Sequence, residues 1–144
     1  MDAVAVQEML REDRREWDSL GTLLEARPYE PLHDPESPEW MSRDVYTHLA
    51  RWMEHSTGEL EARLSGGTQP PLDGTDDEIN AGFRSAHSHL SLDEARAWAQ
   101  REFDRRIEAI KAVPPDRWDP ILEAVAHADG AEHYRAHHGY IAVS

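Results

Sequence analysis

Three histidines occupy positions where helical spacing would turn them toward the inside of a protein. His133 and His137 are four residues apart, so on a helix they share one face. His48 lies three residues after Val45 and four before Trp52, on the apolar face of another predicted helix. Imidazoles that converge in this way can bind one divalent ion at about 2.0–2.1 Å from each nitrogen. The pattern therefore predicts a metal site formed by His48, His133 and His137.

The same pattern has a simpler interpretation, in which each histidine is a core residue hydrogen-bonded to its neighbours. The chain contains 9 histidines, so a pair at a spacing of four arises easily from composition alone. Spacing by itself leaves both interpretations open. A site with three histidine ligands would keep a coordination position free, as catalytic sites do. An ion there would activate water or a thiol, which favours hydrolysis or thiol transfer.

Aromatic and polar side chains near these histidines are candidates for a substrate pocket. Trp52, Tyr134 and Trp40 would form an apolar wall, as in most ligand sites, although each would also suit the core. His55 lies three residues after Trp52 and is the candidate acid–base group on that helix. His138 cannot face inward together with the histidine before it, so we expect it in solvent. Four further histidines have no predicted role: His33, His87, His89 and His127.

The elements that would position these residues are predicted to be helices. Apolar residues recur at spacings of three and four over residues 2–27, and the pattern ends before Pro28. A second helix is predicted over residues 42–64, with its first residue as the N-cap. Asp44 in its first turn favours the helix start; the alternative is that it orients the second nitrogen of His48.

Three capping boxes predict further helices. They open the ranges 75–86, 91–113 and 129–141 at a threonine, a serine and an aspartate, each followed three residues later by a glutamate. Asp119 and Pro120 start another helical stretch. No segment alternates as a strand would. The chain is therefore predicted to be all-α: a single domain over residues 1–144, built as a four-helix bundle with one or two short additional helices. The long second connection indicates that not every link is a tight hairpin.

Composition limits the classes of function. The 144 residues include 29 acidic and 15 basic side chains, a net charge of −14, which argues against nucleic acid or an anionic membrane as partner. The absence of cysteine excludes disulfides, iron–sulfur clusters, thiolate zinc sites and cysteine nucleophiles. No apolar run is long enough for a spanning helix, and the acidic N-terminus is unlike a signal peptide. We expect a cytoplasmic domain.

Four segments together resemble the DinB-like superfamily. WMSRDVYTHLARW at residues 40–52 resembles its W-x-x-x-D-V-x-x-H-L-x-x-W motif, and EHYRAH at residues 132–137 resembles the E-H-Y-x-x-H of its last helix. DEINA at residues 77–81 and LSLDE at residues 90–94 resemble the ClbS/DfsB branch of that superfamily. Each motif is short, and the resemblance rests on their joint occurrence in the expected order.

The resemblance implies a four-helix bundle that holds a divalent metal, commonly nickel or zinc, on His48, His133 and His137. Asn80 matches an asparagine of the ClbS/DfsB branch and is expected in the pocket. The superfamily includes enzymes that use low-molecular-weight thiols, and the branch resembles self-resistance proteins that add water to a strained electrophilic ring. The resemblance thus implies a detoxification enzyme, hydrolase or thiol-dependent transferase, for a small-molecule electrophile. The alternative is a non-catalytic bundle that sequesters a small molecule and keeps a vestigial metal site. Homodimerisation is expected from the relatives.

Overall fold

The computed structural model describes residues 1–32, 34, 35 and 37–143, so His33 lies outside the described residues. Helix is the regular structure throughout that part of the chain, which confirms the all-α prediction. The helices are α1 (Ala3–Ala26), α2 (Ser42–Leu64), α3 (Asp76–Ala86), α4 (Leu92–Lys111), α5 (Pro120–His127) and α6 (Ala131–Val143), with a short 3-10 turn at Pro115–Arg117.

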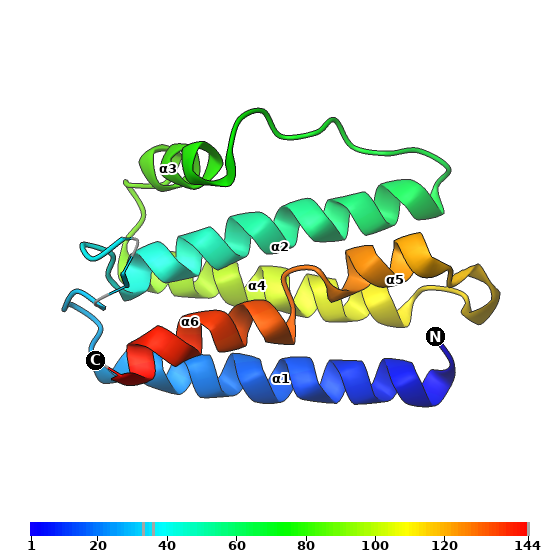
Figure 1. Cartoon of the computed structure of the whole chain (residues 1–144), viewed down its shortest axis with the longest axis horizontal. Helices are drawn as coiled ribbons and strands as arrows, with labels where there is room; N and C mark the ends of the chain where they lie inside the picture. The colour runs from blue at the N-terminus through cyan, green and yellow to red at the C-terminus, as the bar shows by residue number, and fades with distance from the viewer. Residues whose placement is uncertain (33, 36, 144) are drawn as a thin grey trace.

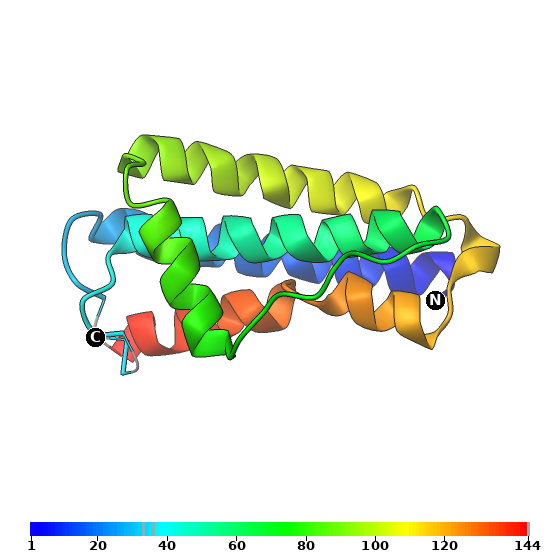
Figure 2. The same ribbon diagram turned by 90° about the horizontal axis from the view of Figure 1, so that it is seen from above.

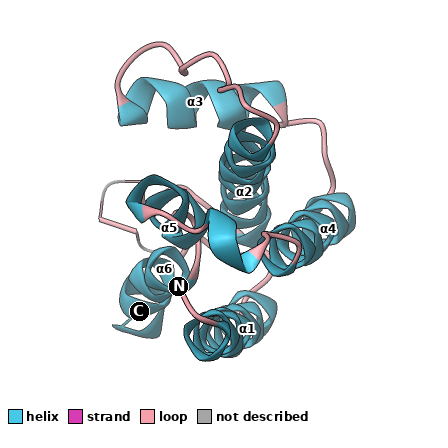
Figure 3. Ribbon diagram, turned by 90° about the vertical axis from the view of Figure 1, so that its right-hand side faces the viewer, coloured by secondary structure: helices cyan, strands magenta, loops and turns pink. Residues whose placement is uncertain are grey.

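Four rods form the bundle, and α3 lies outside them (Figures 1 and 3). α1, α2 and α4 are single helices, whereas α5 and α6 follow one another as two halves of the fourth rod. α2 and α4 run in the same direction, because the long connection that contains α3 carries the chain back along the bundle (Figure 2). The second connection is therefore a crossover and not a hairpin, as the sequence indicated.

Local capping explains where three of the helices begin. Thr75 Oγ1 accepts a hydrogen bond from the Glu78 N–H at 3.2 Å, which starts α3. Ser91 Oγ accepts from the Glu94 N–H at 3.1 Å and starts α4 in the same way. At α5, Asp119 Oδ1 accepts from the N–H of Leu122 at 2.8 Å. These starts confirm the predicted ones.

The start of α2 differs from the prediction by one residue. Met41 occupies the N-cap position, and its N–H donates to Asp44 Oδ2 at 2.9 Å. Ser42, the predicted N-cap, instead donates its hydroxyl proton to the carbonyl of Leu24 at 2.7 Å. That carbonyl belongs to the last turn of α1 and lacks a partner within its own helix. The serine therefore ties the end of α1 to the beginning of α2.

The predicted capping box at Asp129 is wrong. Asp129 has a φ of 59°, in the left-handed region, and the helix begins two residues later at Ala131. The Ala131 N–H donates to Asp13 Oδ1 of α1 at 2.8 Å, so the cap of α6 comes from another helix. A cap supplied by a residue so distant in the chain leaves no local sequence pattern.

An aromatic cluster packs at the centre of the bundle. The rings of Trp17 and Phe103 stack with centroids 4.9 Å apart, and Tyr134 meets Trp17 edge-on at 5.2 Å. Tyr134 is fully buried, and its hydroxyl donates to the sulfur of Met53 at 3.1 Å. The structure therefore places Tyr134, a predicted pocket residue, in the core.

A buried ion pair joins three helices beside that core. Arg106 Nη1 of α4 lies 2.6 Å from Asp13 Oδ2 of α1, and both residues are buried. Arg106 Nη2 donates to the carbonyl of Ala126 in α5. The remaining oxygen of Asp13 caps α6. The pair is therefore hydrogen-bonded on both sides, as a buried pair must be if its desolvation is to be offset.

None of the described helices has both the length and the apolar composition needed to cross a bilayer.

Candidate metal centre

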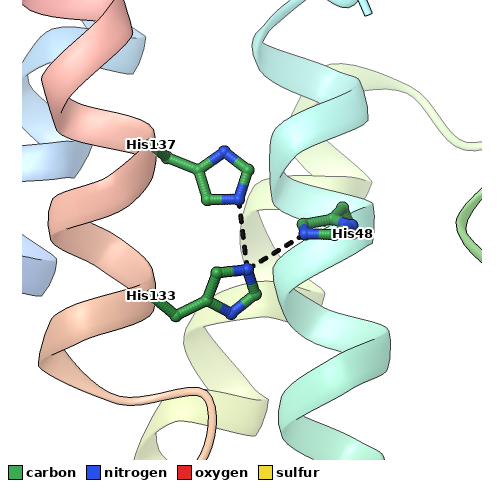
Figure 4. Close-up of side chains that lie close together, drawn as sticks. All are labelled: His48, His133 and His137. Carbon is green, nitrogen blue, oxygen red and sulfur yellow. Dashed lines mark hydrogen bonds between the residues drawn. The ribbon is translucent and has the colours of Figure 1, made fainter. Parts of the chain in front are cut away.

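The structure brings the three predicted histidines together. His48 projects from the second turn of α2, and His133 and His137 project from successive turns of α6 toward it (Figure 4). The start of α2 is fixed by the Met41–Asp44 hydrogen bond, and the start of α6 is fixed by Asp13. One local hydrogen bond and one long-range cap thus determine which residues of α2 and α6 lie opposite each other.

The geometry of the cluster suits one ion. Nε2 of His133 lies 3.1 Å from Nε2 of His48 and 3.2 Å from Nε2 of His137. One ring nitrogen from each of the three residues lies within 4.8 Å of the others. Two nitrogens bound at about 2.0–2.1 Å to a tetrahedral ion are about 3.3 Å apart. The observed spacings are close to that value, so a small adjustment of the rings would accommodate an ion.

Hydrogen bonds among the three rings alone cannot pair all of the nitrogens that converge. An N–H···N bond needs one donor and one acceptor, and a neutral imidazole has a single lone pair in its ring plane. Nε2 of His133 faces two other nitrogens, so its lone pair can accept a well-aligned proton from only one of them. A cation at the centre would instead use all three lone pairs.

Burial keeps two of the imidazoles in the form that binds metals. Burial, reinforced by repulsion from His133, lowers the pKa of His48 to about 3. Burial and repulsion from His133 and His48 also hold the pKa of His137 well below its usual value. Both rings are therefore neutral at physiological pH, with a lone pair available.

A carboxylate lies behind the central histidine. Asp129 Oδ1 is 3.0 Å from Nδ1 of His133, although the ring is turned so that a proton on this nitrogen does not point straight at the oxygen. Burial alone would raise the pKa of Asp129, but the combined effect of His133, Ser56 and Arg106 outweighs it, and the pKa lies below its ordinary value. Asp129 is therefore a carboxylate at neutral pH.

Of the two roles predicted for Asp44, stabilising the helix start and orienting His48, the structure shows the first. Its Oδ2 accepts from the Met41 N–H, and its Oδ1 lies 2.6 Å from Arg43 Nη2 and 3.3 Å from Arg84 Nε. The side chain therefore stabilises the start of α2 and ties α3 to it. It does not orient His48.

A cavity of about 930 Å³ opens beside the histidines, and all three help to line it. Trp40 forms part of its wall, with its ring centroid 5.2 Å from that of His48. A smaller cavity of about 300 Å³ shares His48 and His133 with the first. α3 crosses over this end of α2 (Figure 2) and contributes Asn80 to both cavities.

The predicted pocket residues fall into two groups. Asn80 lines both cavities, and its Oδ1 accepts from Trp52 Nε1 at 2.7 Å, so Trp52, which lines the smaller cavity, holds it in place. His55 lies further along α2, with its ring centroid 6.2 Å from that of Trp52 and outside the histidine cluster. Tyr134 belongs to the core. His138 is half-buried and not exposed as expected.

Two residues of the site were missed at the sequence level. Asp129 was interpreted as a helix cap, although an aspartate followed by glycine is also a turn signal. Arg84 lines the cavity and forms ion pairs with Glu39 and Asp44, at 3.2 and 3.3 Å. No local pattern distinguishes this arginine from the others of an ordinary helix surface.

Comparisons with known proteins find no match: no family model, no curated protein and no solved structure is similar to this chain at a significant level. The resemblance to the DinB-like superfamily therefore stays a prediction that rests on four short motifs. Function must be inferred from the histidine cluster and the cavity beside it.

Proposed function

We propose that this chain is a DinB-like metalloenzyme of small-molecule detoxification or self-resistance. It holds nickel or zinc on His48, His133 and His137 and adds water or a low-molecular-weight thiol to an electrophilic substrate. One observation carries the proposal: three ring nitrogens converge at the wall of a cavity of about 930 Å³. That volume is in the range of about 300–1,000 Å³ that is usual for small-molecule sites.

The donor set fits the proposed ions. Imidazole nitrogen suits both zinc and nickel, and three protein ligands leave a position open on the side of the cavity. When bound, such an ion lowers the pKa of a coordinated water or thiol toward neutrality and so supplies a nucleophile. His48 and His137 are only 8% and 6% exposed, which limits competition from bulk water for their lone pairs.

The remaining lining residues bind and orient the substrate. Trp40 provides aromatic surface in the larger cavity and Trp52 in the smaller one, and His48 lines both cavities. Asn80 uses its carbonyl oxygen to accept from Trp52, and its amide nitrogen carries two protons that can donate to an oxygen of a bound molecule.

The first test is the metal content of tag-free protein. We expect near-stoichiometric nickel or zinc after incubation with either ion, and its loss in His133→Ala. His127→Ala is the matched control, because His127 is exposed at the end of α5 and lies outside the cluster. Unchanged metal content in His133→Ala would refute the ligand assignment.

A turnover assay then separates catalysis from sequestration. The metal-loaded protein, at a small fraction of the substrate concentration, is mixed with an epoxide probe, with and without a low-molecular-weight thiol. Consumption of many equivalents supports an enzyme, and dependence on the thiol identifies the nucleophile. Consumption that stops at one equivalent supports the sequestering alternative instead.

A further inference from the structure

The fourth rod of the bundle is interrupted next to the histidine cluster. α5 ends at His127 and α6 begins at Ala131, and the break between them is visible in Figure 1. Asp129 occupies the break with a φ of 59°, and among the described residues it is the one non-glycine residue with a positive φ. Aspartate adopts this region more readily than most residues, and contacts from the surrounding structure fix it here.

Groups from two other helices hold the break in place. Arg106 Nη2 binds the carbonyl of Ala126 before the break, and Asp13 Oδ1 binds the N–H of Ala131 after it. A Cβ atom on Gly130 would clash with Arg106 Nη2 and Asp13 Oδ1, so the close approach requires glycine. The backbone on both sides of Asp129 is therefore fixed by the buried ion pair between α1 and α4.

This fixed backbone directs the carboxylate at the central histidine. Asp129 Oδ1 lies 3.0 Å from Nδ1 of His133, and its side chain is 15% exposed. In this structure a proton on Nδ1 would not point straight at the oxygen, and a rotation of the ring would align the two. Because an ionised carboxylate can only accept hydrogen bonds, the tautomer with its proton on Nδ1 is the one that the carboxylate stabilises. A neutral ring with its proton on Nδ1 has its lone pair on Nε2. That is the nitrogen that faces His48 and His137.

We propose that Asp129 is the positioning residue of the cluster: it fixes the tautomer and the orientation of His133 so that the Nε2 lone pair points to the centre. The consequence for metal affinity rests on the proposed function, whereas the tautomer is a property of the metal-free protein. The alternative tautomer would place a proton between His133 and the other two rings and would block the centre. Carboxylates behind metal-bound histidines act in this way, and their loss typically weakens metal affinity 10–100-fold.

Two substitutions separate this role from a purely structural one. Asp129→Gly removes the carboxylate but suits a positive φ, so the break keeps its conformation. Asp129→Asn keeps an oxygen that accepts a hydrogen bond, and asparagine tolerates the left-handed region. We expect zinc and nickel affinity to fall about 10–100-fold in Asp129→Gly and by less in Asp129→Asn, with the melting temperature of the metal-free protein kept or raised in both. Asp119→Asn is the matched control, because asparagine also caps α5 and Asp119 is far from the cluster.

The tautomer is measured directly on metal-free protein by long-range ¹H–¹⁵N correlation of the histidine rings. We expect His133 to carry its proton on Nδ1 in the wild type and to lose that preference in Asp129→Gly. A wild-type His133 with its proton on Nε2 would overturn the inference even if the protein binds metal. So would zinc affinity in Asp129→Gly equal to that of the wild type. A wild type that binds neither ion would refute the proposed function, and the tautomer measurement would still decide this inference.

Discussion

The buried pair of Asp13 and Arg106 allows a sharp prediction about stability. Both residues are 2% exposed, and Asp13 also caps α6. In Asp13→Asn, the amide oxygen can still accept from the Ala131 N–H, so the cap is kept while the negative charge is lost. Arg106 then stays buried without a counter-charge, which typically costs about 3–5 kcal/mol. Since 1 kcal/mol lowers the melting temperature of a domain of this size by about 2–4 °C, the expected decrease is about 6–20 °C.

A matched control lies one residue away on the same helix. Glu12 of α1 pairs with Arg135 of α6, but the two side chains are 44% and 47% exposed. Glu12→Gln should leave the stability nearly unchanged, because solvent screens exposed pairs. Both variants are compared by thermal melting in the absence of metal. If Asp13→Asn melts within about 2 °C of Glu12→Gln, the assignment of a stabilising buried pair is refuted.

A double variant tests the cause of the loss. Asp13→Asn combined with Arg106→Met removes the uncompensated charge and leaves an apolar side chain in its place. Replacing a whole buried pair in this way is often neutral, so the double variant should be more stable than Asp13→Asn alone. A double variant less stable than the single one would show that packing and not charge explains the effect.

Three further predictions concern the turn, the histidines and the cavity. Gly130→Ala should destabilise the protein by about 1–3 kcal/mol, because its Cβ displaces Arg106 and Asp13; an unchanged melting temperature would contradict this. In metal-free protein, the pKa of His48 is about 3 when folded and near 6.5 when unfolded, so stability should decrease as pH falls below 6.5, by roughly 2 kcal/mol at pH 5. Urea unfolding at pH 8, 6 and 5 measures this, and a flat profile would argue against a buried neutral ring. Asn80→Ala should leave metal affinity unchanged and weaken ligand binding, as calorimetry with the epoxide probe would detect.

The starts of α3, α4 and α5 and the histidine set were accessible from the sequence because they depend on local spacing. The capping boxes at Thr75 and Ser91 connect residues three apart, and such patterns are visible in one dimension. The pair His133 and His137 shares a helix face for the same reason. The facing position of His48 followed from the apolar residues around it, which mark the side of α2 that turns toward the core.

Tyr134 is the predicted pocket residue for which the angle around a helix was ignored. It follows His133 directly, and one residue turns the helix by about 100°, which here directs the tyrosine side chain into the core. The structure accordingly buries Tyr134 against Trp17. His55 failed for a different reason: it is two turns beyond His48 on the long helix α2, so it lies past the level at which α6 faces the cavity.

The cap of α6 could not be predicted, because it depends on a contact between residues far apart in the chain. Asp13 and Ala131 are separated by 118 positions and meet only when α1 packs against α6. Without that contact, the acidic residue before the helix is the natural candidate for the cap, and Asp129 was interpreted in this way. The long-range cap releases Asp129 from that role and leaves its carboxylate free to face His133.

The negative charge of Asp129 has a second effect on metal binding, because of where His133 lies in α6. His133 is the third residue of α6, and the N-terminus of a helix carries a partial positive charge of about half a unit, which opposes the binding of a cation nearby. A partly buried carboxylate 3.0 Å from the ring offsets that repulsion. Loss of the charge should therefore weaken metal binding even where the oxygen beside Nδ1 is kept. The difference between Asp129→Asn and the wild type measures the electrostatic part. The difference between Asp129→Gly and Asp129→Asn measures the part due to the oxygen as a hydrogen-bond acceptor.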